Sequence, residues 1–268
     1  MPVRPALRTR FQEELRTLED QALGALDMVV STLDRALEAL SHQDVELASI
    51  VIHDDDRIDG RFLEVHQGIL SLLALQAPVA SDLRVVAALL HTIKHAERMG
   101  DQCVNIAKLI PLSGHEPPRN KQLMELIEQM GVLARSEVKQ AKQAFALRDV
   151  EVAEDLVRQD QRINKLNRDA FKLGVEIGTD EDTREWAMHM MLVARALERI
   201  GDNAVDIGEQ VAFVVTGLFR EFSDASRYAQ HDSWPEPAGL RSALVTIPLP
   251  CATRRVTATG VGSMLPQR

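Results

Sequence analysis

The chain has 268 residues, of which 45% are hydrophobic, 26% charged and only 4% aromatic, and its formal net charge is −9. This length allows a sizeable core, the scarcity of aromatic residues favours helices over a sheet, and the acidic balance argues against a nucleic-acid-binding protein. Two cysteines, Cys103 and Cys251, exclude a disulfide framework and are typical of the cytosol. Signal-peptide and bilayer-spanning patterns are not recognisable. We therefore expect a cytoplasmic protein that meets a membrane only through partners.

Long proline-free stretches with helical periodicity predict six helices. They run over residues 7–40, 43–75, 79–110, 118–147, 149–177 and 181–218. Gly178 follows the fifth stretch and is a typical residue for ending a helix. From about residue 219 the pattern gives way to prolines and small polar residues, so we predict a disordered tail over residues 220–268.

The two halves of the helical region repeat each other. The segment DVELASIVIHDDDRI (44–58) aligns with DVEVAEDLVRQDQRI (149–163), at an offset of 105 residues from Asp44 to Asp149. The stretch around Glu97 aligns with that around Glu198 at an offset of 101. Each half therefore contains three helices. The predicted fold is all-α, with one three-helix bundle in residues 1–114 and a second, related by pseudo-symmetry, in residues 115–219.

The third helix of each half carries acidic residues one helical turn apart. They are Glu97 and Asp101 in the first copy, and Glu198, Asp202 and Asp206 in the second. On a helical wheel these acids lie at the edge of the apolar stripe, while Gly100 and Gly201 lie within it. The repeated glycine suggests that a neighbouring helix approaches closely, most simply for packing. The acids repel each other, and their partial burial is unfavourable unless a cation balances them.

The second helix of the first half has the same spacing of acids, in Asp55 and Asp59. Its copy has Asp160 with Asn164. Two helices could thus present carboxylates to one groove, and an all-oxygen cluster suits hard or borderline cations. The alternative is a solvated acidic edge, bridged by lysine or arginine from a neighbour. Both interpretations are open at this point.

Other chemical signatures are weak. His91 and His95 have a spacing that can bind zinc, but they lie away from the acids on the wheel and are expected to be surface histidines. Cys103 is expected to be a small core residue. The eight histidines lack the glutamate three residues earlier that di-iron carboxylate bundles use, which excludes that class. Phosphate loops and serine nucleophile motifs are also missing, so we do not expect an enzyme.

The doubled motifs ERMGD (97–101) and ERIGD (198–202), with DDDRID (54–59) and VVTG (214–217), resemble the PhoU family of bacterial phosphate-uptake regulators. The resemblance covers residues 8–219 and implies two three-helix bundles. It also implies multinuclear clusters of divalent or iron-type metals, which some members hold and others lack. The matching residues are Asp55, Asp59, Glu97 and Asp101 in the first half and Asp160, Glu198 and Asp202 in the second. Asn164 departs from the family's acid, and Asp206 is the residue expected to compensate.

The resemblance further implies a function without catalysis. Such a protein would be a cytosolic homodimer that links the ATPase of a phosphate ABC transporter to a sensor histidine kinase. It would keep the phosphate regulon off and restrain uptake when phosphate is abundant. Three alternatives remain open: an accessory subunit of another phosphate transporter, a metal-dependent phosphate-ester hydrolase, and a purely structural scaffold.

Overall fold

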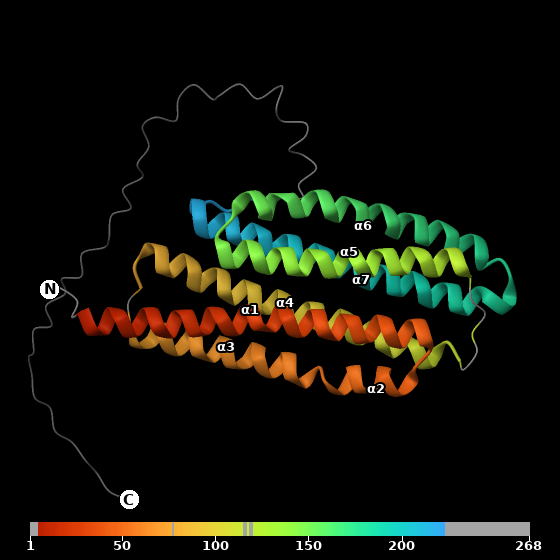
Figure 1. The fold of residues 1–268 in the computed structure, drawn as a ribbon, viewed down its shortest axis with the longest axis horizontal. Coiled ribbons are helices and arrows are strands. Elements are labelled where there is room, and N and C mark those ends of the chain that lie inside the picture. The colour runs from red at the N-terminus through yellow and green to blue at the C-terminus, as the bar shows by residue number, and fades with distance from the viewer. Residues whose placement is uncertain (1–4, 77, 115–116, 118–119, 223–268) are drawn as a thin grey trace, which may run out of the picture. The chain divides into compact units, whose positions relative to one another are not determined.

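The computed structural model describes residues 5–76, 78–114, 117 and 120–222. These residues form seven α-helices and no strand. The helices are α1 (Pro5–His42), α2 (Val45–His53), α3 (Asp56–Leu75), α4 (Ala80–Leu112), α5 (Lys121–Leu147), α6 (Val150–Ile177) and α7 (Glu181–Thr216) (Figure 1). None of these described helices is long and apolar enough to cross a membrane. A disordered tail was predicted over residues 220–268. Residues 223–268 of it lie outside the described residues.

The expected helix over residues 43–75 is two helices, and its prediction as one was wrong. The break lies at Asp54 and Asp55, where Ile58 N donates to Asp55 O in a tighter turn at 2.8 Å. Arg35 on α1 donates from Nη1 to Asp54 Oδ2 at 2.5 Å. Arg35 and Asp54 are 19 residues apart and lie on different elements. The spacing of apolar residues within 43–75 therefore does not reveal the break. The corresponding stretch of the second half continues unbroken as α6.

The repeat is visible in how the chain leaves one helix and enters the next. Gln43 and Arg148 both take up left-handed backbone angles, with φ of 57° and 55°. Asp44 then accepts a hydrogen bond from Leu47 N at 2.9 Å, and Asp149 accepts two backbone N–H groups at 3.0 and 3.1 Å. These side chains satisfy amides at the start of a helix that lack a partner within it. The same capping device thus occurs at equivalent places in both halves.

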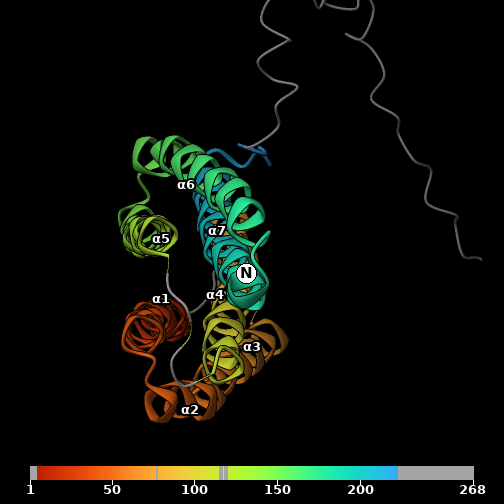
Figure 2. The same cartoon turned by 90° about the vertical axis from the view of Figure 1, so that its right-hand side faces the viewer.

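The helices pack as two three-membered bundles, which confirms the predicted architecture. In the first bundle α2 and α3 together take one place beside α1 and α4, and the second bundle contains α5, α6 and α7 (Figure 1). The bundles meet through α4 against α7 and α1 against α5, as the end-on view shows (Figure 2). Both belong to one compact unit, Met1–Asp224. The predicted boundary at residues 114 and 115 falls between α4 and α5, and the division of the chain into domains there stays a prediction.

Burial in α1 and α5 follows the same register. Every buried residue of α5 has a buried counterpart 105 positions earlier in α1. The two helices are therefore equivalent in structure, although the repeat was recognised from other segments. One pair differs in charge. Thr32 in α1 corresponds to Glu137 in α5, and both are buried.

Candidate functional site

Carboxylates from three helices meet in the second bundle. Asp160 comes from α6, Glu198 and Asp202 from α7, and Glu137 from α5. A β-carbon added to Gly201 would lie 2.8 Å from Glu137 Oε2 and 3.2 Å from Asp160 Oδ1. The acids of α5 and α6 therefore lie against the bare backbone of α7. The glycine makes this approach possible, which explains its place in the apolar stripe.

Three of these acids are more than nine-tenths buried. Glu137 is 0% exposed, Asp160 8% and Glu198 7%. Among the described residues, both oxygens of Glu137, Oδ1 of Asp160 and Oε2 of Glu198 have no hydrogen-bond partner. Asn164 Nδ2 donates to the other oxygen of Asp160 at 2.6 Å, and Arg195 donates to the other oxygen of Glu198. Buried oxygens without partners are unfavourable unless a proton or cation satisfies them.

The pKa values of this group reflect its burial and its crowded negative charge. Burial, followed by repulsion from Asp160 and Asp202, raises the pKa of Glu137 to about 9. Burial and neighbouring acids raise the pKa of Asp160 to about 7. The pKa values of Glu198 and Asp202 are also raised, mainly by burial. The cluster therefore favours either bound protons or a bound positive ion.

The first bundle contains a shallower version of this cluster. Burial, with repulsion from Asp59 and Asp101, raises the pKa of Asp55 to about 6. Burial and then the nearby Glu97 raise the pKa of Asp101. None of these four acids is fully buried. A β-carbon on Gly100 would lie 3.2 Å from Asp55 Oδ1, so a glycine beside an acid occurs in the first bundle too.

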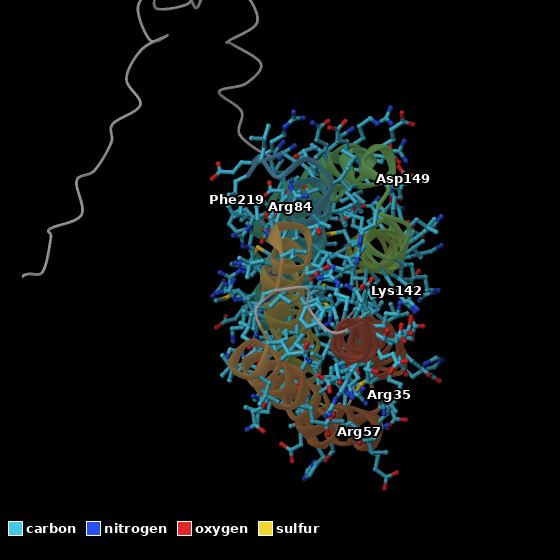
Figure 3. All side chains as sticks on the ribbon, turned by 90° about the vertical axis from the view of Figure 1, so that its left-hand side faces the viewer. Arg35, Arg57, Arg84, Lys142, Asp149 and Phe219 are labelled. Carbon is cyan, nitrogen blue, oxygen red and sulfur yellow. The ribbon has the colours of Figure 1, made fainter. Side chains whose placement is uncertain are left out.

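Basic side chains contact the acids of the first bundle. Lys94 Nζ lies 2.7 Å from Glu97 Oε2. Arg35 and Arg57 lie near α2 (Figure 3), at 2.5 and 3.9 Å from Asp54 Oδ2. The hydrogen bond from Arg35 lowers the pKa of Asp54. Bridging of acids by basic neighbours, the alternative to a metal site, therefore accounts for Glu97 in this cluster and for Asp54 beside it.

The predicted site residues are thus brought together in two groups, with one at the margin. Asp55, Asp59, Glu97 and Asp101 form the first group, and Asp160, Glu198 and Asp202 form the second. Asp206 lies toward α4, where its Oδ2 is 3.4 Å from His95 Nδ1.

His95 was expected on the surface, and this was wrong. It is 8% exposed, hydrogen-bonds with Asn203 Oδ1 at 2.8 Å across the α4–α7 contact, and burial lowers its pKa. The wheel of one helix cannot show that a second bundle covers that face. His91 is exposed and Cys103 is buried, as expected.

Sequence reasoning missed Glu137. It has no acidic neighbour one turn away, so the search for paired acids passed over it. The available signal was its position in the apolar stripe of α5, between Ala134, Val138 and Ala141. A charged residue inside such a stripe is unusual unless it is paired or coordinates a ligand.

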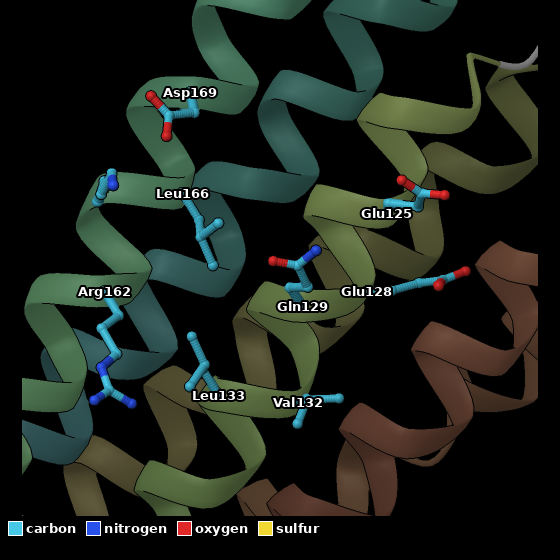
Figure 4. Close-up of a pocket in the computed structure, with 9 residues that line it drawn as sticks. Glu125, Glu128, Gln129, Val132, Leu133, Arg162, Leu166 and Asp169 are labelled. Atoms are coloured by element: carbon cyan, nitrogen blue, oxygen red, sulfur yellow. The ribbon is translucent and has the colours of Figure 1, made fainter.

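A groove of about 700 Å³ lies between α5 and α6 (Figure 4). None of the residues that line it belongs to the cluster of Glu137, Asp160, Glu198 and Asp202. Glu125 and Glu128 line it from α5, Arg162 lines it from α6, and Leu133 and Leu166 contribute apolar surface. Arg162 is about 200° around the helix from Asp160. The groove and the acidic cluster therefore use different sides of α6.

Comparison with known proteins identifies the family. The PhoU domain model matches residues 24–110 and 127–211, one segment in each bundle. The chain belongs to the PhoU family. It is 31% identical over 213 residues to the phosphate-specific transport system accessory protein PhoU homolog of Zymomonas mobilis, covering 77% of this chain and 87% of that protein. The homolog of Deinococcus radiodurans is also 31% identical, with 79% and 99% covered. The resemblance predicted from the doubled motifs is confirmed.

Solved PhoU structures have the same fold. The crystal structure of the phosphate transport system regulatory protein PhoU from Streptococcus pneumoniae matches with a TM-score of 0.73 at 29% identity, covering 79% of this chain and 99% of that one. PhoU from Pseudomonas aeruginosa matches with a TM-score of 0.72 at 26% identity, covering 78% and 100%. In both cases nearly the whole of the solved chain is matched by this one.

The donor chemistry of the second cluster, though not the present arrangement of its side chains, suits the metal that the PhoU resemblance implies. Across the described residues, no group of three or more His, Cys, Asp or Glu side chains stands in an arrangement that could hold a metal ion. Side-chain rotation would have to bring the carboxylates together. The unpartnered oxygens of Asp160 and Glu198 are available for this, and an all-carboxylate donor set suits Mg²⁺, Mn²⁺ or iron.

Proposed function

We propose that this chain is a non-catalytic, negative regulator of phosphate uptake. In this proposal it is a cytosolic homodimer that connects the ATPase subunit of a phosphate ABC transporter to a sensor histidine kinase. The observation that carries the proposal is the PhoU match in both bundles. The names of relatives from Zymomonas mobilis and Deinococcus radiodurans, which are phosphate-specific transport system accessory proteins, support it further. The protein would meet the membrane only through the transporter.

Deletion of the gene tests the regulatory role. Alkaline phosphatase should be produced in phosphate-rich medium after deletion, and the intact gene should restore repression. Altered phosphate uptake without altered phosphatase would favour an accessory subunit of another transporter. Unchanged phosphatase and uptake, in a strain without a second PhoU protein, would refute both roles. Hydrolysis of p-nitrophenyl phosphate by the purified protein with Mn²⁺ would contradict the non-catalytic assignment.

Dimerisation and partner binding need separate measurements. Light scattering of the purified chain should give twice the monomer mass if the homodimer is correct. Pull-down with the isolated transporter ATPase and with the cytosolic part of the kinase should capture both. Capture of neither would remove the adaptor role even if the deletion phenotype were present.

We also propose that the acidic clusters hold cations. Asp55, Asp59, Glu97 and Asp101 would hold the first, and Asp160, Glu198 and Asp202 the second, with Asp206 at its margin. The buried, unpartnered oxygens of Asp160 and Glu198 support this role. A bound metal would supply positive charge and coordination positions for phosphate oxygens.

Metal analysis of the purified protein tests the cation role directly. We expect bound metal that is reduced in a variant with Glu198→Gln and Asp202→Asn, together with weaker repression in cells. Protein without metal, combined with unchanged stability and repression in that variant, would instead favour a scaffold with solvated acids.

A further inference from the structure

We infer that Glu137 is an additional metal ligand and that the second cluster therefore binds its cation more tightly than the first. This inference rests on the cation-binding role proposed above and assigns to it a residue that lies outside the paired acidic motifs. It also makes the two halves of the molecule unequal, although their helices repeat. Four observations support it, concerning the aim of the side chain, its lack of partners, its counterpart in α1 and its neighbours.

The side chain of Glu137 is aimed at the other acids. Its Oε2 and the Oδ1 of Asp160 lie within 3.2 Å of one point, the position a β-carbon would take on Gly201. Glu137 reaches this point from α5 and Asp160 from α6, while Glu198 and Asp202 flank the glycine on α7. A cation beside Gly201 would therefore be approached from three helices.

Within the described residues, nothing else satisfies Glu137. It is 0% exposed, and neither of its oxygens has a hydrogen-bond partner. Protonation would remove its charge and let its O–H donate to Asp160 Oδ1, yet the second oxygen of Glu137 and the free oxygen of Glu198 would still need donors. A cation would satisfy Glu137 together with the free oxygens of Asp160 and Glu198. With the side chains turned toward it, one ion would account for all the unpartnered acidic oxygens of this cluster.

The counterpart of Glu137 in the first bundle carries no charge. Thr32 occupies the equivalent buried position on α1, and its Oγ1 accepts a hydrogen bond from Arg35 Nη2 at 3.5 Å. Arg35 in turn forms the ion pair with Asp54. The acids of the first cluster themselves also have nearby cations, since Lys108 acts to lower the pKa of both Asp55 and Asp101, which reduces the demand of this cluster for a metal ion.

The second bundle replaces this ion pair with neutral groups. Gln140 and Gln159 stand 105 positions after Arg35 and Asp54, and their side chains hydrogen-bond to each other. Asn164 likewise stands where the first half has Asp59. Glu137 supplies a carboxylate from inside the bundle where α6 lacks one. The second cluster therefore keeps its acidic donors and places them deeper, with Arg195 paired to Glu198 but with no counterpart of the Arg35–Asp54 ion pair.

Mn²⁺ titration of the full-length chain tests this inference. The protein is first stripped with a chelator, and binding is followed by calorimetry and by the electron paramagnetic resonance signal of free Mn²⁺. A background with Asp59→Asn and Asp101→Asn isolates the second cluster, and one with Asp160→Asn and Asp202→Asn isolates the first. We expect the lower dissociation constant in the background that retains the second cluster.

Glu137→Gln keeps the size of the side chain and removes its charge. It should raise the dissociation constant of the second cluster by about 10- to 100-fold, the range typical when support for a metal is lost. The first cluster should be unchanged. Thr32→Val is the matched control, because it alters the equivalent buried position without touching a proposed ligand. Glu137→Asp, which retains the charge on a shorter side chain, should fall between the wild type and Glu137→Gln.

The possible failures are distinguishable. Unchanged affinity of the second cluster in Glu137→Gln, while Asp160→Asn weakens it, would overturn the role of Glu137 and leave the cation role standing. Tighter binding by the first cluster would overturn the predicted order. Absence of Mn²⁺ binding in the unmodified chain would overturn the cation role itself, and with it this inference. Circular dichroism of each stripped variant establishes that the helices are retained.

Discussion

Replacing Gly201 with alanine tests whether the glycine exists to admit the acids. The added β-carbon would lie 2.8 Å from Glu137 Oε2, and 3.2 Å from both Asp160 Oδ1 and Ile163 Cδ1. All three atoms belong to side chains, but Glu137 is fully buried and Asp160 nearly so. They cannot move toward solvent without disturbing the contact between α5, α6 and α7. We therefore expect the substitution to push the two carboxylates away from α7.

Two opposing effects set the magnitude. Alanine is favoured over glycine within a helix by about 1 kcal/mol. Overpacking of a buried site costs about 1–3 kcal/mol. Gly201→Ala should therefore change the free energy of unfolding by between about zero and 2 kcal/mol in the destabilising direction. Gly24 in α1 is the matched control, since nothing lies within 4 Å of its added β-carbon. Gly24→Ala should stabilise by about 1 kcal/mol.

Urea unfolding of the chelated protein measures both changes, and the double variant Gly201→Ala with Glu137→Ala adds a third. Removing the Glu137 carboxylate should relieve most of the cost of the new methyl group, so the two substitutions should not be additive. Stabilisation by Gly201→Ala equal to that by Gly24→Ala would show that the acids do not fill the space beside the glycine. Additive effects would show that Glu137 is not the group displaced.

Further predictions concern pH, helix caps and the contact between bundles. The pKa of Glu137 is raised from 4.5 to about 9, so the chelated protein takes up a proton on folding between these values. Its unfolding free energy should fall as pH rises through this range, and Glu137 alone contributes up to about 1.4 kcal/mol per pH unit. Glu137→Gln should reduce the slope by that amount in urea titrations and leave the fall due to Asp160, whose pKa is raised to about 7; an unchanged slope in the variant would contradict the reasoning. Asp44→Ala and Asp149→Ala should each lower stability by about 1 kcal/mol, and an unchanged melting temperature in both would refute a role for these caps. Asn203→Ala removes the hydrogen bond between Asn203 Oδ1 and buried His95 and should cost about 1 kcal/mol in thermal unfolding. An unchanged melting temperature would show that Asp206, 3.4 Å from the same nitrogen, replaces it.

Much of the fold follows from local sequence signals. Proline-free stretches with helical periodicity marked the long helices, and the match between Asp44 and Asp149 revealed the repeat and the two bundles. The break between α2 and α3 was not predictable in the same way. It coincides with an ion pair from Arg35 to Asp54, and residues 19 positions apart on different helices leave no mark on a helical wheel.

The candidate site was predictable where its residues form a pattern. Acids one turn apart, repeated beside a glycine, identified Glu198 and Asp202 and placed them near Asp160. Glu137 and His95 escaped because their environments are made by other helices: α6 and α7 surround the first, and α7 covers the second. Its place in the apolar stripe of α5 marks Glu137 as unusual, and an alignment of α1 with α5 by their buried positions shows that the first half has no acid there.

That alignment also shows how one repeat can diverge without altering its fold. Thr32 and Glu137 differ in charge, yet the buried positions around them on α1 and α5 coincide. An unpaired buried acid is strongly destabilising, and apolar substitution at such a site is generally accessible. An acid at position 137, in the space beside Gly201, therefore calls for a compensating interaction. A cation that stabilises the folded chain by binding it alone would supply this compensation, and it would couple the stability of the second bundle to metal supply.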